Sequence, residues 1–248
     1  MCEVVAGPLE AARLAPGASL VAIGRVANLA GHDTFAFDLP QDDEARITRL
    51  VKADDRADRR AAWRLARRLA GIALACDPAG VALFRATSGR PFLPAGCGHD
   101  LNVAHASGWV AVGLARATPA TAERNDGGII GVDVERARDL DLWTRLAGEF
   151  MHPEDIDLWS RLPTEQRPAA ALAQWCGKEA LLKATGEGLS ADPCRVRLPA
   201  AGGVVTRHGQ SFLTGAGTLP DAAYAFAVDG PAPRIFLATA TGWDELNR

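Results

Sequence analysis

Residues 131–135 read Gly131-Val132-Asp133-Val134-Glu135, and this short stretch indicates both the fold and the chemistry. Apolar and acidic residues alternate in it, which is typical of a β-strand because successive side chains on a strand point to opposite faces. We therefore expect the two valines to face a core, and Asp133 and Glu135 to lie side by side on the other face. Taken alone, the same pattern also fits an acidic strand that faces solvent.

Two carboxylates held that close repel each other, and each raises the pKa of the other. A bound cation removes this penalty, and ligands that offer only oxygen suit Mg²⁺ or Mn²⁺ better than Zn²⁺. The pair Asp133 and Glu135 is therefore a candidate metal site.

A second stretch, residues 175–186, reads W-C-G-K-E-A-L-L-K-A-T-G and is expected to end a helix spanning about 167–185. Glu179 and Lys183 are four residues apart, so they share one face of that helix in the favourable order. Gly186 is a normal place for a helix to stop. The other interpretation of these two charges is an ordinary exposed ion pair, which contributes little to stability.

A third stretch, Leu101-Asn102-Val103-Ala104-His105, alternates in polarity and predicts a strand. His105 then lies just past the strand end, at a loop, where functional side chains concentrate. In isolation the segment also fits an ordinary core or surface histidine.

Strands and helices alternate along the chain, which predicts the α+β class. Strands are expected at 19–27, 81–85, 101–104, 109–115, 129–135, 195–198, 204–207, 224–228 and 235–239, and helices at about 54–75, 140–150, 153–161 and 167–185. The first helix has an apolar face, and its opposite face is expected to be solvated; that face carries Arg56, Arg60, Arg64 and Arg67.

The polar segment 118–128 is the best candidate for a linker. It separates an N-terminal α+β half, 1–128, from a C-terminal α+β half, 129–248, and each half has a long helix among strands. This arrangement hints at an internal duplication.

Composition narrows the class of protein. The chain has 248 residues, with 27 Lys and Arg against 30 Asp and Glu, so its net charge of −3 does not favour binding of polyanions over the whole surface. No apolar run approaches the roughly 20 residues of a membrane helix, and no basic segment precedes an apolar one at the N-terminus, so we expect neither a membrane span nor a signal peptide. Five scattered cysteines without a C-x-x-C pair indicate a reduced, cytoplasmic protein.

Taken in order, these stretches resemble the Sfp-type 4'-phosphopantetheinyl transferase family. That family shows G-[KR]-P, a strand ending N-x-S-H, then G-[IV]-D-[IV]-E, then W-x-x-K-E-[AS]-x-x-K-x-x-G. This chain has Gly89-Arg90-Pro91 and then residues 102–105, 131–135 and 175–186 at those places. The resemblance covers roughly residues 42–198, and its last two motifs are the specific ones.

The resemblance implies a fold and a reaction. The fold is a pseudo-twofold monomer of two similar α+β subdomains, with the active site in the cleft between them. The reaction moves 4'-phosphopantetheine from coenzyme A to a serine of an acyl or peptidyl carrier protein, releases 3',5'-ADP and needs Mg²⁺, for which Mn²⁺ can substitute. The implied partners are coenzyme A and the carrier protein, with neither nucleic acid nor membrane.

The resemblance also assigns residues to roles. Asp133, Glu135 and Glu179 are the metal ligands it implies. The candidate catalytic residues are Glu179, Lys183 and Glu135, with Glu179 as the preferred base for the carrier's serine. The residues expected to bind coenzyme A are Arg46, Arg85, Arg90, His105 and Lys183.

The chain departs from the family pattern at one motif, because Ala104 and Ala106 replace the serines that usually flank the histidine. A hydroxyl contact to phosphate is lost there. One alternative function is a catalytically inactive module that binds carrier proteins, and the intact acidic residues argue against it. Another is a different Mg²⁺-dependent nucleotide enzyme, such as a phosphohydrolase, and the lack of further acidic and histidine clusters argues against that.

Overall fold

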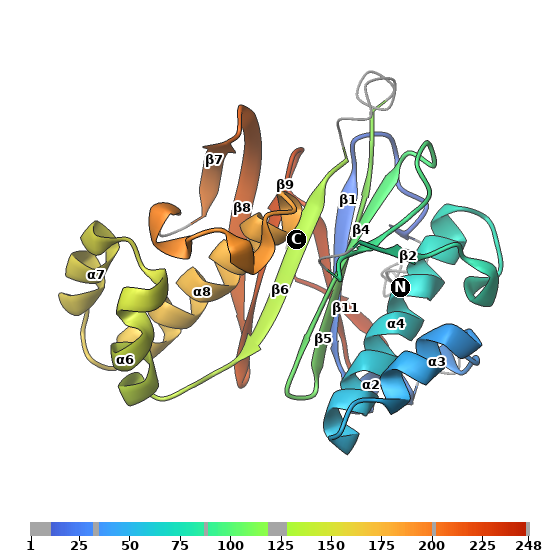
Figure 1. Cartoon of the computed structure of the whole chain (residues 1–248), viewed down its shortest axis with the longest axis horizontal. Coiled ribbons are helices and arrows are strands. Elements are labelled where there is room, and N and C mark those ends of the chain that lie inside the picture. The colour runs from blue at the N-terminus through green and yellow to red at the C-terminus, as the bar shows by residue number, and fades with distance from the viewer. Residues whose placement is uncertain (1–10, 32–34, 87–88, 119–127, 200–201, 247–248) are drawn as a thin grey trace, which may run out of the picture.

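The computed structural model describes residues 11–31, 35–86, 89–118, 128–199 and 202–246. Two β-sheets lie against each other in the middle of the molecule, and helices cover their outer faces (Figure 1). The α+β class predicted from the alternation of strands and helices is confirmed.

The first sheet has the strand order β11-β10-β1-β5-β4. Its strands are β1 at Ser19–Arg25, β4 at His99–Ala106, β5 at Trp109–Arg116, β10 at Arg234–Ala238 and β11 at Trp243–Glu245. Helix α4, Ala53–Ala73, packs on this sheet, and α2, Val26–Ala30, and α3, Gln41–Thr48, lie against α4 (Figure 1). Strands β2, Phe84–Arg85, and β3, Pro91–Phe92, form a separate small hairpin.

The second sheet has the order β6-β9-β8-β7. Its strands are β6 at Ile130–Arg136, β7 at Gly203–Arg207, β8 at Gln210–Leu219 and β9 at Ala222–Val228. Helix α8, Arg167–Ala184, covers its outer face, and α6, Leu140–Phe150, and α7, Pro153–Ser160, pack against α8 (Figure 1). Short 3-10 turns lie at Pro78–Gly80, Gly188–Ser190 and Pro193–Arg195.

Three apolar clusters hold these layers together. Val132 and Val134 of β6 belong to a cluster shared by the two sheets, together with Ile23 of β1. Leu69 of α4 and Leu181 of α8 each belong to a separate cluster on the outer side of one sheet. Burial of apolar surface at about 25 cal/mol per Å² is the main stabilising contribution, so each long helix fixes its sheet and the shared cluster fixes the sheets to each other.

Most expected elements are confirmed to within a few residues, and two differences have clear reasons. The strand expected at 195–198 is wrong, because the chain makes the 3-10 turn Pro193–Arg195 there and the residues that follow belong to no strand. Strand β8 was not expected because Gly215 and Gly217 interrupt its apolar pattern. A Cβ at either glycine would lie within 2.7 Å of the ring of Phe226 or Tyr224, so the aromatic rings of β9 occupy that space.

The C-terminal strands return to the first sheet. Strand β10 pairs in parallel with β1, and β11 pairs with β10, so residues 234–245 complete the sheet built by the N-terminal half. The division into halves at residue 128 and the pseudo-twofold relation stay predictions. Within the predicted linker 118–128, residues 119–127 lie outside the described residues, as does the N-terminal segment 1–10.

The predicted solvated arginine face of α4 is wrong at Arg67. This side chain is buried, and its Nη2 lies 2.6 Å from Oδ2 of Asp43 on α3, while its Nη1 donates to the carbonyl of Val81 at 2.8 Å. A helical pattern of charges cannot distinguish water from a neighbouring carboxylate, and here α3 supplies the carboxylate.

Candidate active site

Helix α8 crosses strand β6 in direct contact at Gly131. A Cβ at this position would lie 2.0 Å from the carbonyl oxygen of Ala180 and 2.6 Å from the amide nitrogen of Ala184, so only glycine lets the helix come so close. The expected alternation of β6 is confirmed, since the valines face the other sheet. The acidic face of the strand, however, lies under α8 rather than in water.

Asp133 is buried under that helix and paired with Lys183. Asp133 is only 4% exposed, and Nζ of Lys183 lies 2.6 Å from its Oδ1. The same ammonium donates to the carbonyl of Val132 at 3.3 Å. Oδ2 of Asp133 is buried and has no hydrogen-bond partner among the described residues. Lys183 therefore pairs with Asp133 on the strand below, although Glu179 lies one turn away on the same helix.

Glu135 and Glu179 are half-buried within electrostatic reach of this carboxylate. Burial raises the pKa of Glu135, and the charge of Asp133 raises it further. Burial also raises the pKa of Glu179, against the lowering effect of Lys183, and Asp133 again adds to the rise. Asp133 thus acts electrostatically on both of the other predicted metal ligands, and we call Asp133, Glu135 and Glu179 the acidic group.

The chemistry of the acidic group fits a hard divalent cation. It offers only carboxylate oxygens, one of which is buried and unpartnered, and mutual repulsion makes a positive charge favourable there. The described residues nevertheless contain no cluster of three or more His, Cys, Asp and Glu side chains already arranged to hold a metal ion. Binding of a metal ion by Asp133, Glu135 and Glu179 therefore stays a prediction.

His105 lies inside β4 and pairs with Val110 of β5, so its expected place in a loop past the strand end is wrong. Burial lowers its pKa to about 4, and the positive charges of Arg59 and Lys183 contribute to the lowering. His105 is therefore neutral at pH 7, and the carboxylate of Asp55 opposes the effect of the two cations. The phosphate contact expected of this residue stays a prediction.

Arg59 on α4 was missed by the sequence analysis, which placed four other arginines of this helix on a solvated face and gave Arg59 no role. Its Nε is buried without a hydrogen-bond partner among the described residues, and burial lowers its pKa. The preceding residue, Asp58, accepts a hydrogen bond of 3.0 Å from the backbone N–H of Gly108, in the turn between β4 and β5. This contact holds Arg59 beside the end of β4, and no local pattern in the sequence marks it.

Arg59 also approaches two of the predicted coenzyme A contacts. Arg85 lies 3.8 Å above the ring of Trp63 and 3.6 Å from Asp43. Burial lowers the pKa of Arg85, and the charges of Arg59 and Arg46 lower it further, against the opposite effect of Asp43. Arg46 and Arg59 thus both act electrostatically on Arg85, and we call Arg46, Arg59 and Arg85 the basic group.

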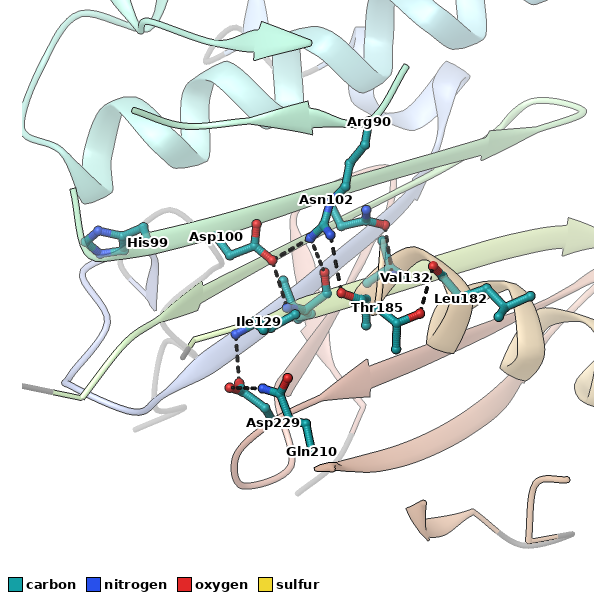
Figure 2. Close-up of polar contacts among 12 residues, drawn as sticks. Arg90, His99, Asp100, Asn102, Ile129, Val132, Leu182, Thr185, Gln210 and Asp229 are labelled. Carbon is teal, nitrogen blue, oxygen red and sulfur yellow. Dashed lines mark hydrogen bonds and ion pairs between the residues drawn. The ribbon is translucent and has the colours of Figure 1, made fainter. Parts of the chain in front are cut away.

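Arg90 has a different environment from the basic group. Its Nη2 lies 2.7 Å from Oδ2 of Asp100 on β4, and its guanidinium also donates to the carbonyls of Ile130 and Ala184, each at 3.3 Å (Figure 2). Arg90 therefore joins β4 to β6 and to the end of α8. Its predicted contact with coenzyme A stays a prediction, and three of its five N–H donors already bond to these protein acceptors.

The seam between β4 and β6 consists of side chains on one strand and backbone groups on the other. Asp100 accepts a hydrogen bond of 3.0 Å from the N–H of Ile130, and Asn102 accepts one of 3.0 Å from the N–H of Val132 (Figure 2). Strand β6 is an edge strand of its sheet, so these contacts satisfy backbone groups that the sheet leaves unpaired. They also fix how β4, which carries His105, lies in space relative to β6, which carries Asp133 and Glu135.

Lys178 is a second residue whose role the sequence analysis did not assign. It is fully buried, and its ammonium donates to the carbonyls of Phe150 at 2.7 Å and Pro193 at 3.1 Å. It thereby ties the end of α6 and the turn after α8 to the helix that carries Glu179. The sequence offered one signal for a role of Lys178, its position directly before Glu179 in the motif of residues 175–186.

Comparison with known proteins supports the family resemblance, and the matching family model covers the C-terminal half of the chain. Residues 129–226 match the family model described as the 4'-phosphopantetheinyl transferase superfamily. A 4'-phosphopantetheinyl transferase of Bacillus subtilis is 29% identical over 126 residues, which are 51% of this chain and 50% of that protein. The chain thus aligns with about half the length of this relative. The resemblance stated from the motifs is confirmed, and in the described part of the chain no helix is long and apolar enough to span a membrane.

Proposed function

Since residues 129–226 match the 4'-phosphopantetheinyl transferase superfamily, we propose that this protein transfers 4'-phosphopantetheine from coenzyme A to a serine of an acyl or peptidyl carrier protein. The observation that carries the proposal is the position of His105. Burial lowers its pKa, and two cations lower it further: Arg59 from the N-terminal half and Lys183, which pairs with Asp133 of the acidic group in the C-terminal half. One anionic ligand can therefore contact both halves.

The acidic group would hold Mg²⁺ through Asp133, Glu135 and Glu179. When bound, this ion neutralises negative charge that develops on the leaving phosphate. Lys183 supplies a further point charge beside it, although in the free protein its ammonium is paired with Asp133. If Asp133 served as a metal ligand, the ammonium of Lys183 would become available to the phosphates.

Glu179 is the proposed base for the hydroxyl of the carrier's serine. Burial raises the pKa of this carboxylate, so Glu179 is a stronger base than an exposed glutamate. Glu135 has a raised pKa for the same reason and is the second candidate.

The basic group and His105 would bind the phosphates of coenzyme A. Arg59 and Arg85 are partly desolvated cations, and desolvation strengthens their attraction for phosphate. Arg46 is exposed at the edge of the same group, where it would attract the ligand from solution.

The alternative of an inactive carrier-binding module finds no support in the described site, because every predicted catalytic carboxylate is present and partly or fully buried. The cytoplasmic location and the monomeric state stay predictions.

Intact-protein mass spectrometry tests the proposal. An apo acyl carrier protein and an apo peptidyl carrier protein are each incubated with this protein, coenzyme A and Mg²⁺, with EDTA in a parallel sample. The expected result is a mass increase of one phosphopantetheine that EDTA prevents. No increase on either carrier, with coenzyme A binding intact by calorimetry, would support the inactive module instead.

A further inference from the structure

A pocket of about 330 Å³ lies between α7, α8 and β8. Apolar side chains form most of its wall, including Leu158, Trp159 and Leu162. Cavities that bind small molecules usually have about 300–1,000 Å³ and a few polar groups in an apolar lining. The pocket is at the lower end of that range, so it suits a small ligand.

The pocket is separate from the acidic group. Helix α8 contributes Ala170, Ala173, Gln174 and Gly177 to it. With 3.6 residues per turn, the centre of that face lies about half a turn around the helix from Glu179. Neither β6 nor β9 lines the pocket. A ligand there would not compete with the proposed site for coenzyme A.

A buried carboxylate in the wall has an unused oxygen. Asp155 of α7 is only 6% exposed, and its Oδ1 lies 3.2 Å from Nε of Arg197. Its Oδ2 is buried and has no hydrogen-bond partner among the described residues. A buried acceptor left unpaired costs about 1–3 kcal/mol, so a donor that reached Oδ2 would be favourable.

A second polar atom in the wall is in the same state. Oε1 of Gln174 is buried without a partner within the described ranges. The terminal amide can turn to present its oxygen or its NH₂ group, so Gln174 accommodates a donor or an acceptor. The ligand therefore needs a donor for Asp155 and tolerates a second polar atom nearby.

We propose that this pocket binds a small molecule with an apolar body and one hydroxyl or ammonium donor, which Oδ2 of Asp155 accepts. Arg197 already balances the charge of Asp155, so a neutral donor is sufficient and a cation is not required. Three probes of nearly the same size separate these contributions: 2-phenylethanol carries a neutral donor, phenethylammonium carries a charged donor, and ethylbenzene carries none.

The test uses the full chain and does not depend on the proposed transferase activity. Each probe is titrated while backbone amide shifts are followed by NMR, with Leu158 and Thr214 as reporters in the wall. The expected result is saturable binding of 2-phenylethanol and phenethylammonium at these amides, with ethylbenzene at least about fivefold weaker. Absence of binding by all three probes, or equal affinity for all three, overturns the proposal.

Two variants check the location. Asp155→Asn keeps an oxygen for Arg197 and places an NH₂ group where the ligand donor should go, so it is expected to weaken binding of 2-phenylethanol about fivefold or more and leave ethylbenzene unchanged. Glu154→Gln is the matched control, because Glu154 is exposed and also contacts Arg197 but does not line the pocket. Unchanged binding in folded Asp155→Asn contradicts the proposal, and the probe comparison on the natural chain decides if that variant does not fold.

Discussion

Asn102 on β4 and Lys183 on α8 both bond to the same residue of β6. The amide oxygen of Asn102 accepts from the N–H of Val132, and the ammonium of Lys183 donates to the carbonyl of Val132. Val132 lies on the edge of its sheet, where the backbone groups on one side have no strand partner within the described part of the chain. Two side chains from different layers thus hold the strand directly beside Asp133.

We predict that Asn102→Leu lowers both stability and carrier modification, because the N–H of Val132 is left buried and unpaired. The expected loss in the free energy of unfolding is about 1–3 kcal/mol, measured by urea denaturation. Asn102→Asp retains the acceptor and should restore most of the activity. A leucine variant with unchanged stability and unchanged activity would show that the seam does not position β6.

Asp133→Ala is predicted to reduce carrier modification by at least about a hundredfold, since it removes one charged ligand and leaves Lys183 without its carboxylate. It should also lower the pKa values of Glu135 and Glu179, which Asp133 now raises. Single-turnover mass spectrometry and carboxyl NMR measure the two effects. Near-normal transfer would remove Asp133 from the proposed metal site.

His105→Ala is predicted to weaken coenzyme A binding more than it slows the reaction at saturating coenzyme A. The residue lies among positive charges where a phosphate is expected, so its loss affects binding of the ground state first. Calorimetry gives the affinity, and kcat is measured at high coenzyme A concentration. An unchanged affinity would exclude His105 from the phosphate site.

The lowered pKa of His105 also predicts how stability depends on pH. The pKa is about 4 in the folded protein against an ordinary value of 6.5, so between these values the unfolded chain binds a proton that the folded protein does not. The free energy of unfolding should therefore fall as the pH is lowered from 6.5 towards 4. His105→Gln should show a smaller fall in urea titrations over this range, and an identical profile would contradict the assignment.

Arg59→Gln is predicted to weaken coenzyme A binding and to raise the pKa of His105, because it removes a positive charge that acts on the histidine. Histidine NMR titration measures the pKa. Arg64→Gln is the matched control, since it removes the same charge elsewhere on α4 and should change neither quantity. Equal effects of both variants would indicate a general charge effect of the helix rather than a contact at Arg59.

Local periodicity explains what could be predicted from the sequence. The alternation in β6 and the i,i+4 spacing of Glu179 and Lys183 depend only on the geometry of a strand and of a helix. The motifs that they form indicated the family, and with it the grouping of the acidic residues and the expectation of a phosphate contact at His105.

Long-range contacts explain what could not be predicted. Arg67 and Arg59 belong to one amphipathic helix, and nothing in its pattern shows that Asp43 buries the first or that Gly108 fixes the helix beside the second. Arg90 belongs to a family motif, but its partners on β4, β6 and α8 come from three other segments.

The sequence alone therefore determined the elements, the carboxylates and the family resemblance, because each depends on neighbours within a few residues. Only the tertiary structure decided that the acidic face of β6 lies under α8, that β10 joins β1, and that Arg59 and Lys183 both act on His105. These arrangements result from packing between segments far apart in the chain, and such packing depends on the shape and burial of the whole molecule rather than on local spacing.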